Sequence, residues 1–149
     1  MMRQIGIVTF VVGCLCTSSQ AGLASGDLKK PGVIKVTGRE IARQKHGRGV
    51  GDIEVTRLGL FNTRITTKSI GHAELVCVYL GDHRMRNCTG AFSLPKGKIV
   101  VGGTIVFADL YDLAVLGGTG LYNNVRGTLT VTALGGKPPS FLLLFRLVV

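Results

Sequence analysis

Short apolar and β-branched runs recur along this chain, and glycine- or proline-rich turns separate them. In the clearest run, 125–133, apolar residues alternate with Arg126 and three threonines. Such alternation is typical of a strand with one buried face. No run carries the longer period of an amphipathic helix. Seven or eight strands at this close spacing predict an all-β fold, either an antiparallel sandwich or an antiparallel barrel.

A single antiparallel β-barrel of about eight strands is the better of these two predictions. Gly102 and Gly103 interrupt the long run 98–107, and paired glycines inside a strand mark sharp bends such as barrel corners. Closure into a barrel also removes the exposed strand edges that an open sheet would leave.

Two of the expected strands depart from simple alternation. Ile53 and Val55 share one face, whereas Leu58 and Leu60 fall on the other, which predicts a bulge between them. The last run, 141–149, is apolar on both faces. In a monomeric barrel one face should be wet, so this run predicts that another element or another subunit covers the outer face. We therefore expect a homo-oligomer.

The first 21 residues have the pattern of a secretory signal peptide. Arg3 precedes an apolar run at 5–16, and 19–21 supplies small residues for cleavage. The run is shorter than the roughly 20 residues that span a bilayer. We expect cleavage after Ala21 and a secreted or periplasmic protein. The alternative is a lipoprotein processed at Cys14, which ends a lipobox-like sequence.

Residues 22–51 form a basic, glycine-rich segment before the expected barrel domain at 52–149. Seven of the 18 lysines and arginines lie in 29–48, so the net charge of +10 largely describes this segment. We expect a partly flexible arm with one short strand at 33–36. Such an arm suits an anionic glycan or membrane surface. Nucleic acid is not expected as a partner, because no aromatic residues for base stacking lie among the basic ones.

Two cysteines, Cys77 and Cys88, follow the expected signal peptide. The residues between them are polar at their centre and include Gly81-Asp82, which predicts a hairpin loop. An even number of cysteines in an exported protein indicates a disulfide. We therefore expect a Cys77–Cys88 bond that joins two neighbouring strands.

Signatures of common cofactor and metal sites do not occur in the sequence. The Gly-Gly-Thr-Gly run at 117–120 joins two expected strands, whereas a phosphate-binding glycine loop opens a helix. The histidines His46, His72 and His83 lack the spacing of metal ligands. We therefore expect neither a cofactor nor a metal.

A few polar residues are candidates for chemistry. Asp109 and Asp112 flank Tyr111, and as paired acids they could do acid–base work, although aspartates also favour surface turns. Arg126 and Arg146 lie in expected strands. If those faces line the lumen, each arginine requires a carboxylate or an anionic ligand, because an unpaired buried charge is costly. The candidate carboxylates are Glu54, Glu74 and Asp112.

Residues 113–128, Leu-Ala-Val-Leu-Gly-Gly-Thr-Gly-Leu-Tyr-Asn-Asn-Val-Arg-Gly-Thr, form a longer motif. This motif resembles a signature of the allene oxide cyclase-like and dirigent barrel superfamily. There, a strand ends in Val-x-Gly-Gly-Thr-Gly, and an aromatic residue and Arg-Gly follow. The run 94–105 resembles the superfamily's preceding strand, and the cysteine hairpin is similar to that of exported microbial members. The resemblance spans roughly 52–149 and implies an eight-stranded barrel, often trimeric, with a largely apolar lumen. The motif positions here are Gly117, Gly118, Thr119, Gly120, Tyr122, Arg126 and Gly127.

The resemblance implies a barrel that binds a reactive small molecule and controls the conformation in which that molecule reacts. Dirigent proteins guide the coupling of phenoxy radicals, and allene oxide cyclases close a fatty-acid epoxide into a cyclopentenone. We therefore expect an exported barrel that binds a small hydrophobic molecule in its lumen, either with or without steering its reaction as an isomerase or cyclase. The alternative is a structural or surface-interaction barrel whose basic arm binds an anionic surface. The candidate catalytic residues are Tyr111, Asp112, Tyr122 and Arg126.

Overall fold

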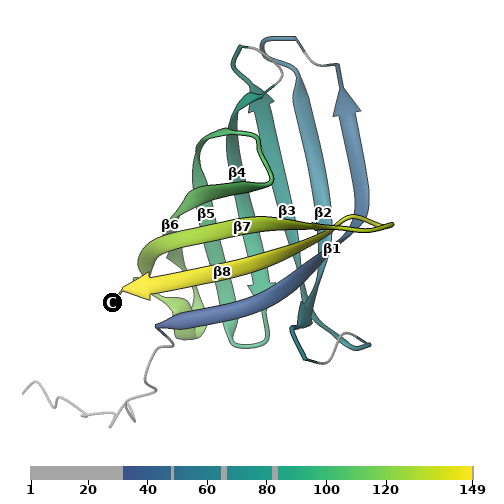
Figure 1. Cartoon of the computed structure of the whole chain (residues 1–149). Coiled ribbons are helices and arrows are strands. Elements are labelled where there is room, and N and C mark those ends of the chain that lie inside the picture. The colour runs from purple at the N-terminus through teal and green to yellow at the C-terminus, as the bar shows by residue number, and fades with distance from the viewer. Residues whose placement is uncertain (1–31, 48, 65–66, 82–83, 149) are drawn as a thin grey trace, which may run out of the picture.

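A computed structural model describes residues 32–47, 49–64, 67–81 and 84–148. The expected signal peptide and Cys14 lie outside these residues. Eight antiparallel strands close into a barrel in sequence order, which confirms the predicted fold (Figure 1). The elements are β1 (Val33–His46), β2 (Ile53–Asn62), β3 (Ser69–Tyr79), β4 (Met85–Leu94), β5 (Gly97–Val106), β6 (Leu110–Gly118), the single-turn helix η1 (Gly120–Tyr122), β7 (Arg126–Gly135) and β8 (Ser140–Val148).

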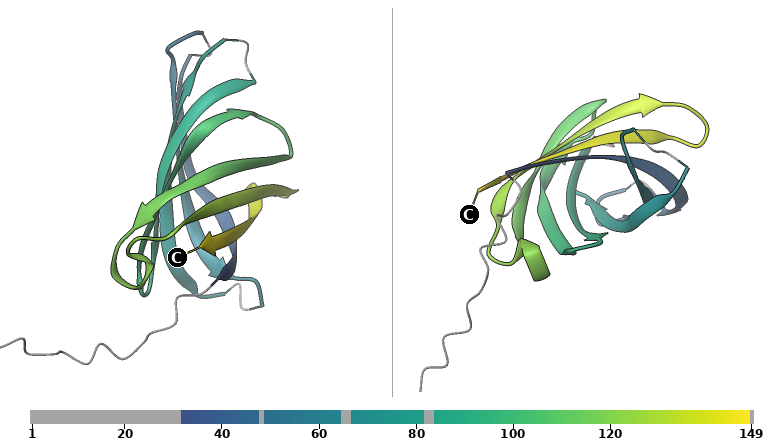
Figure 2. Two further views of the ribbon diagram at one scale, coloured as in Figure 1. Left: turned by 90° about the vertical axis from the view of Figure 1, so that its left-hand side faces the viewer. Right: turned by 90° about the horizontal axis from the view of Figure 1, so that it is seen from below.

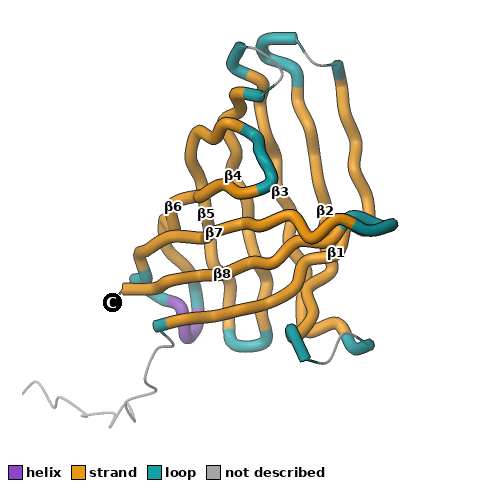
Figure 3. The backbone as a smooth tube through the Cα atoms, viewed as in Figure 1, coloured by secondary structure: helices purple, strands orange, loops and turns teal. Residues whose placement is uncertain are grey.

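The barrel has two ends of different construction. The connections after β1, β3, β5 and β7 lie at one end, which we call the open end, and those after β2, β4 and β6 lie at the other, the packed end. The turn of helix η1 belongs to the packed end (Figure 3). The described part of the chain contains no helix with the length and apolar character needed to cross a bilayer.

The first strand corrects the prediction of a basic arm that ends at residue 51. β1 is a full barrel strand, paired with β8 over Val33–Arg39 and with β2 over Val36–His46. Its basic residues concealed it, because they interrupt the apolar pattern that identifies a half-buried strand. The barrel therefore begins at Val33, and not at residue 52.

A β-bulge at Ile41 changes which side chains of β1 face the lumen. Glu40 pairs with Leu58 and Ala42 with Arg57, so Ile41 is the extra residue, and its side chain is 65% exposed. One inserted residue moves every later side chain to the opposite face of the sheet. Arg43 consequently lies on the lumen side.

β2 has no bulge between Val55 and Leu58, contrary to the sequence prediction. The strand alternates regularly, with Glu54, Leu58 and Leu60 buried and Ile53 exposed on the outer face. The prediction was wrong because it treated Ile53 and Val55 as core residues and the acidic Glu54 as exposed. The register shift of β2 lies further on, between Leu60 and Phe61.

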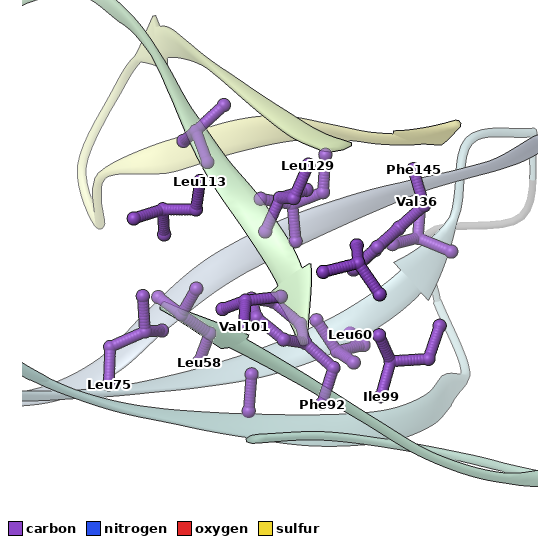
Figure 4. Close-up of a cluster of buried hydrophobic side chains, with 14 of the residues drawn as sticks. Val36, Leu58, Leu60, Leu75, Phe92, Ile99, Val101, Leu113, Leu129 and Phe145 are labelled. Atoms are coloured by element: carbon purple, nitrogen blue, oxygen red, sulfur yellow. The ribbon is translucent and has the colours of Figure 1, made fainter. Parts of the chain in front are cut away.

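Apolar side chains from all eight strands fill the lumen toward the packed end (Figure 4). Phe92 and Phe145 meet edge to face with ring centroids 5.1 Å apart, a favoured aromatic geometry. Alternating residues of β8 face inward, with Leu143 and Phe145 buried. This half of the lumen is a packed core.

The strands separate into two groups toward the open end. β5 pairs with β6 only over Ile99–Gly102, and β1 pairs with β8 only over Val33–Arg39. Beyond these ladders, β1–β5 rise away from β6–β8, which cross them at a steep angle (Figures 1 and 2). The β5–β6 ladder ends at Gly102, which lies in the Gly102-Gly103 pair that predicted a bend.

Candidate functional site

A cavity occupies the lumen at the open end. It encloses about 500 Å³ of empty space, a volume that includes the open solvent at its mouth. Most of its wall is apolar, and a few charged groups interrupt it. The lining residues are Arg43, Glu54, Thr56, Leu58, Leu75, Cys77, Arg86, Phe92, Ile105, Phe107, Tyr111, Val131, Phe141 and Leu143.

A buried carboxylate, Glu54, organises the charged part of the wall. Its Oε2 accepts hydrogen bonds from the Tyr79 hydroxyl at 2.8 Å and from Arg86 Nη1 at 3.2 Å. The ammonium of Lys45, its cross-strand neighbour on β1, lies 3.3 Å from the same oxygen. Only a carboxylate with several such partners is stable in an interior position.

Arg86 lies between two aromatic rings. The guanidinium carbon lies 4.2 Å from the ring centroid of Phe107 and 4.6 Å from that of Tyr79. Cation–π contacts of this kind strengthen when the cation is removed from water, and the residue is only 7% exposed. The rings and Glu54 together hold the guanidinium in one place in the wall.

Arg43 reaches the site from the bulged part of β1. Its Nη2 lies 2.6 Å from Glu40 Oε2, and its Nε lies 3.7 Å from Glu54 Oε1. The Nε atom is buried and makes no hydrogen bond to any described residue. A guanidinium carries five N–H donors, so Arg43 retains a donor for a further acceptor.

The Glu54 carboxylate is ionised at neutral pH. Burial alone would raise its pKa, but the Tyr79 hydrogen bond and the charges of Arg86, Lys45 and Arg43 outweigh burial and lower the pKa below its usual value. A carboxylate with these partners is a fixed negative charge that orients cations. It is a poor proton donor.

Tyr111, one of the predicted catalytic candidates, lines the cavity. Burial raises the pKa of its hydroxyl above 10.0; the charges of Arg43 and Arg86 act in the opposite direction, and that of Glu54 adds to the rise. The hydroxyl is therefore protonated at neutral pH and available as a hydrogen-bond donor. Its ring lies 5.9 Å from that of Phe107, so the two form an aromatic side of the cavity.

The other three candidates lie away from the cavity. Asp112 is exposed on the outer face of β6, and Asp109 is exposed in the turn before it. Tyr122 is buried at the packed end, where η1 follows β6. The exposed Arg126 donates through Nη1 to the Leu116 carbonyl at 2.6 Å and to that of Val125 at 3.1 Å, which ties the β6–β7 connection.

The condition under which Arg126 and Arg146 would need a carboxylate or an anionic ligand, a position facing the lumen, is not met. Both are exposed, and Arg146 donates to Thr130 Oγ1 at 3.2 Å across the outer face. Glu74, a predicted partner, instead pairs on the outside with Arg57 at 2.9 Å.

The glycines of the motif shape the turn at the packed end. Gly120 has a φ of +62°, a conformation that L side chains rarely adopt. A Cβ at Gly127 would collide with the carbonyl oxygen of Arg146 on β8. These positions stabilise the fold, and they lie at the end of the barrel opposite to the cavity.

The predicted Cys77–Cys88 disulfide is present. It joins directly paired residues of β3 and β4, with Cα atoms 4.0 Å apart. Cys77 lines the cavity and is the cross-strand neighbour of Glu54 on β2. The disulfide therefore lies beside the charged cluster.

Sequence reasoning missed the centre of the site. Glu54 was considered only as a partner for other arginines, and Arg43 and Arg86 were not singled out. The alternation of β2 was the available signal for Glu54, because Leu58 and Leu60 lie on its face. Within the described ranges, no three His, Cys, Asp or Glu side chains gather as a metal site would require.

Comparisons with known proteins bear on the fold. No protein-family model and no curated protein matches the chain significantly. A pyocyanin demethylase is similar over 78% of this chain and 99% of its own, with a TM-score of 0.67 and 22% identity. The chain has the barrel fold of the dirigent proteins.

Two further solved structures support this statement. A pterocarpan synthase dirigent protein matches with a TM-score of 0.61 and 11% identity, over 77% of this chain and 91% of its own. The Diels-Alderase AbmU from Streptomyces koyangensis matches with a TM-score of 0.59 and 14% identity, over 84% and 72%. The fold that the sequence motif implied is thus confirmed.

Proposed function

We propose that this barrel binds a small hydrophobic molecule in the cavity at its open end and steers the reaction of that molecule. The observation that carries the proposal is the cavity itself, an apolar pocket into which a few oriented polar groups project. Pockets of this composition are typical of small-molecule sites. The similar structures are named for small-molecule chemistry, as a dirigent protein, a cyclase and a Diels-Alderase.

The polar groups suit control of orientation and charge more than nucleophilic attack. Glu54 and Arg86 form a fixed dipole in the wall, and Tyr111 offers a neutral hydroxyl. Preorganised donors of this kind stabilise charge that develops during a reaction without reorganisation.

Filling the cavity tests the binding proposal. Thr56→Phe places a ring in the lumen, whereas Val55→Phe places the same ring on the outer face of the same strand. Native mass spectrometry with fatty-acid and phenolic ligands should show one guest per chain in the wild type and in Val55→Phe, and none in Thr56→Phe. Equal binding by both variants would place the guest outside the lumen and refute the proposal.

The steering step has its own test. Tyr111→Phe keeps the ring and removes the hydroxyl. With an allene-oxide-type substrate we expect turnover to fall roughly a hundredfold, the usual contribution of a positioned proton donor. Asp112→Asn, on the outer face of the same strand, should leave turnover unchanged. A Tyr111→Phe protein with full activity would reduce the proposed function to binding alone.

We further propose that the protein is exported and self-associates, with a trimer favoured by the sequence resemblance. The Cys77–Cys88 bond fits an oxidising compartment. The outer face of β8 presents Leu142 and Leu144, and Val148 follows beyond the exposed Arg146. Apolar side chains on an outer face suit a subunit contact. Sedimentation of the mature protein at micromolar concentration tests this; a clean monomer would contradict it.

A further inference from the structure

The charges that line the cavity do not balance. Two cations, Arg43 and Arg86, face one carboxylate, Glu54, and Tyr111 is neutral at physiological pH. Lys45 and Glu40 belong to the same ion-pair network but lie outside the lining, and their charges cancel. The otherwise apolar cavity therefore carries one excess positive charge.

Arg43 contributes a donor to this network that lacks an acceptor, its Nε, although its Nη2 pairs with Glu40 at 2.6 Å. Glu54 Oε2 already accepts from Tyr79 and Arg86 and contacts Lys45, whereas Glu54 Oε1 lies 3.7 Å from Arg43 Nε, beyond hydrogen-bond length. That nitrogen is buried with no hydrogen-bond partner among the described residues. A buried N–H without an acceptor is costly, and an anionic acceptor would relieve that cost.

We propose that the guest carries an acidic oxygen group, a carboxylate or its equivalent, which binds at Arg43 while its apolar body lies against Phe107, Tyr111 and Phe141. This inference rests on the proposed function, since it specifies the class of molecule that enters the same cavity. Arg43 is then the specificity-determining residue. The Ile41 bulge positions it, because a regular strand would turn its side chain outward.

Two fluorescent probes of the same shape test the inference. Anilinonaphthalene sulfonate carries an anionic group, and phenylnaphthylamine is the same molecule without it. The wild type should bind the sulfonate about tenfold more tightly, the increment expected of one charge-assisted hydrogen bond. Arg43→Gln should abolish this preference and leave phenylnaphthylamine binding unchanged. Arg57→Gln, an exposed arginine on the outer face of β2, should keep the preference.

A second variant should bind the sulfonate probe more tightly than the wild type. Misfolding cannot produce a gain of this kind. Glu40→Gln removes the carboxylate that competes for Arg43, so its affinity for the sulfonate should rise severalfold. Equal binding of both probes by the wild type would overturn the inference and leave the proposed function standing. An equal loss of both probes in Arg43→Gln would overturn it as well. Binding of neither probe by the wild type would overturn both.

Discussion

The two halves of the lumen are built from the same eight strands but hold different contents. The packed end is filled by side chains such as Leu60, Phe92 and Phe145, each fully buried. The open end holds the Glu54–Arg86 pair and a cavity of about 500 Å³, whose volume includes the solvent at its mouth. The comparison teaches that strand pairing alone does not decide whether a barrel is solid or hollow. The residues on the inner face decide it.

The two halves also differ in how they are held together. At the open end the β5–β6 and β1–β8 ladders have stopped, whereas the other six ladders continue there. At the open end a disulfide and a buried ion-pair network lie together, and they connect strands where these two ladders are absent. Stability is therefore expected to come from apolar packing in one half and from specific bonds in the other.

The largest expected effect is in the packed half. Phe145→Ala should lower the free energy of unfolding by about 4 kcal/mol, because it leaves a void among fully buried neighbours. Phe141→Ala, on the same face of β8 but beside the cavity, should cost clearly less. Urea denaturation measures both. Equal losses would mean that the open half is as tightly packed as the other.

The second-largest loss of unfolding free energy is expected in the open half. Glu54→Gln removes the carboxylate that neutralises Arg86 and Lys45, and should cost about 3 kcal/mol, since breaking a buried pair leaves an uncompensated charge. Glu74→Gln removes a carboxylate from an exposed pair with Arg57 and should cost below about 1 kcal/mol. If both substitutions cost the same in urea denaturation, Glu54 does not organise the site.

The sequence predicted the packed half far better than the open half. Alternating apolar residues in β7 and β8 identify the buried faces of these strands, because an apolar side chain by itself indicates a buried position. In contrast, Arg43 becomes an inner residue only through the bulge at Ile41, which depends on pairing with β2. Arg86 lies in a polar hairpin, and its burial depends on the rings of Tyr79 and Phe107.

The disulfide should contribute slightly less than Glu54. The double variant Cys77→Ala/Cys88→Ala should lose about 2.5 kcal/mol, the amount that loop closure of this short hairpin provides. A reducing agent should destabilise the wild type and leave the double variant unaffected. Hydrogen exchange should localise the loss to β3 and β4, and a uniform loss over the whole barrel would contradict this division between the halves.

Lowering the pH should reduce the stability of the open half by a smaller amount, and the reduction should develop gradually with pH. The folded pKa of Glu54 lies below its usual value of 4.5, so its ionised form stabilises the native state at neutral pH. That contribution is lost as the pH falls from about 4.5 through the lower folded pKa. Glu54→Gln should lack this component of the pH dependence. An unchanged profile in the variant would show that other carboxylates govern acid unfolding.

Two short ladders, Ile99–Gly102 on one side and Val33–Arg39 on the other, are the strand pairings that join β1–β5 to β6–β8 in the described part of the chain. Beyond these ladders, the width of the cavity depends on side-chain contacts such as that between the rings of Phe107 and Tyr111, and not on strand pairing. Its charged groups, in contrast, lie on directly paired strands, as Arg43 and Glu54 do on β1 and β2. A barrel made in this way would tolerate guests of different thickness more readily than guests of different charge.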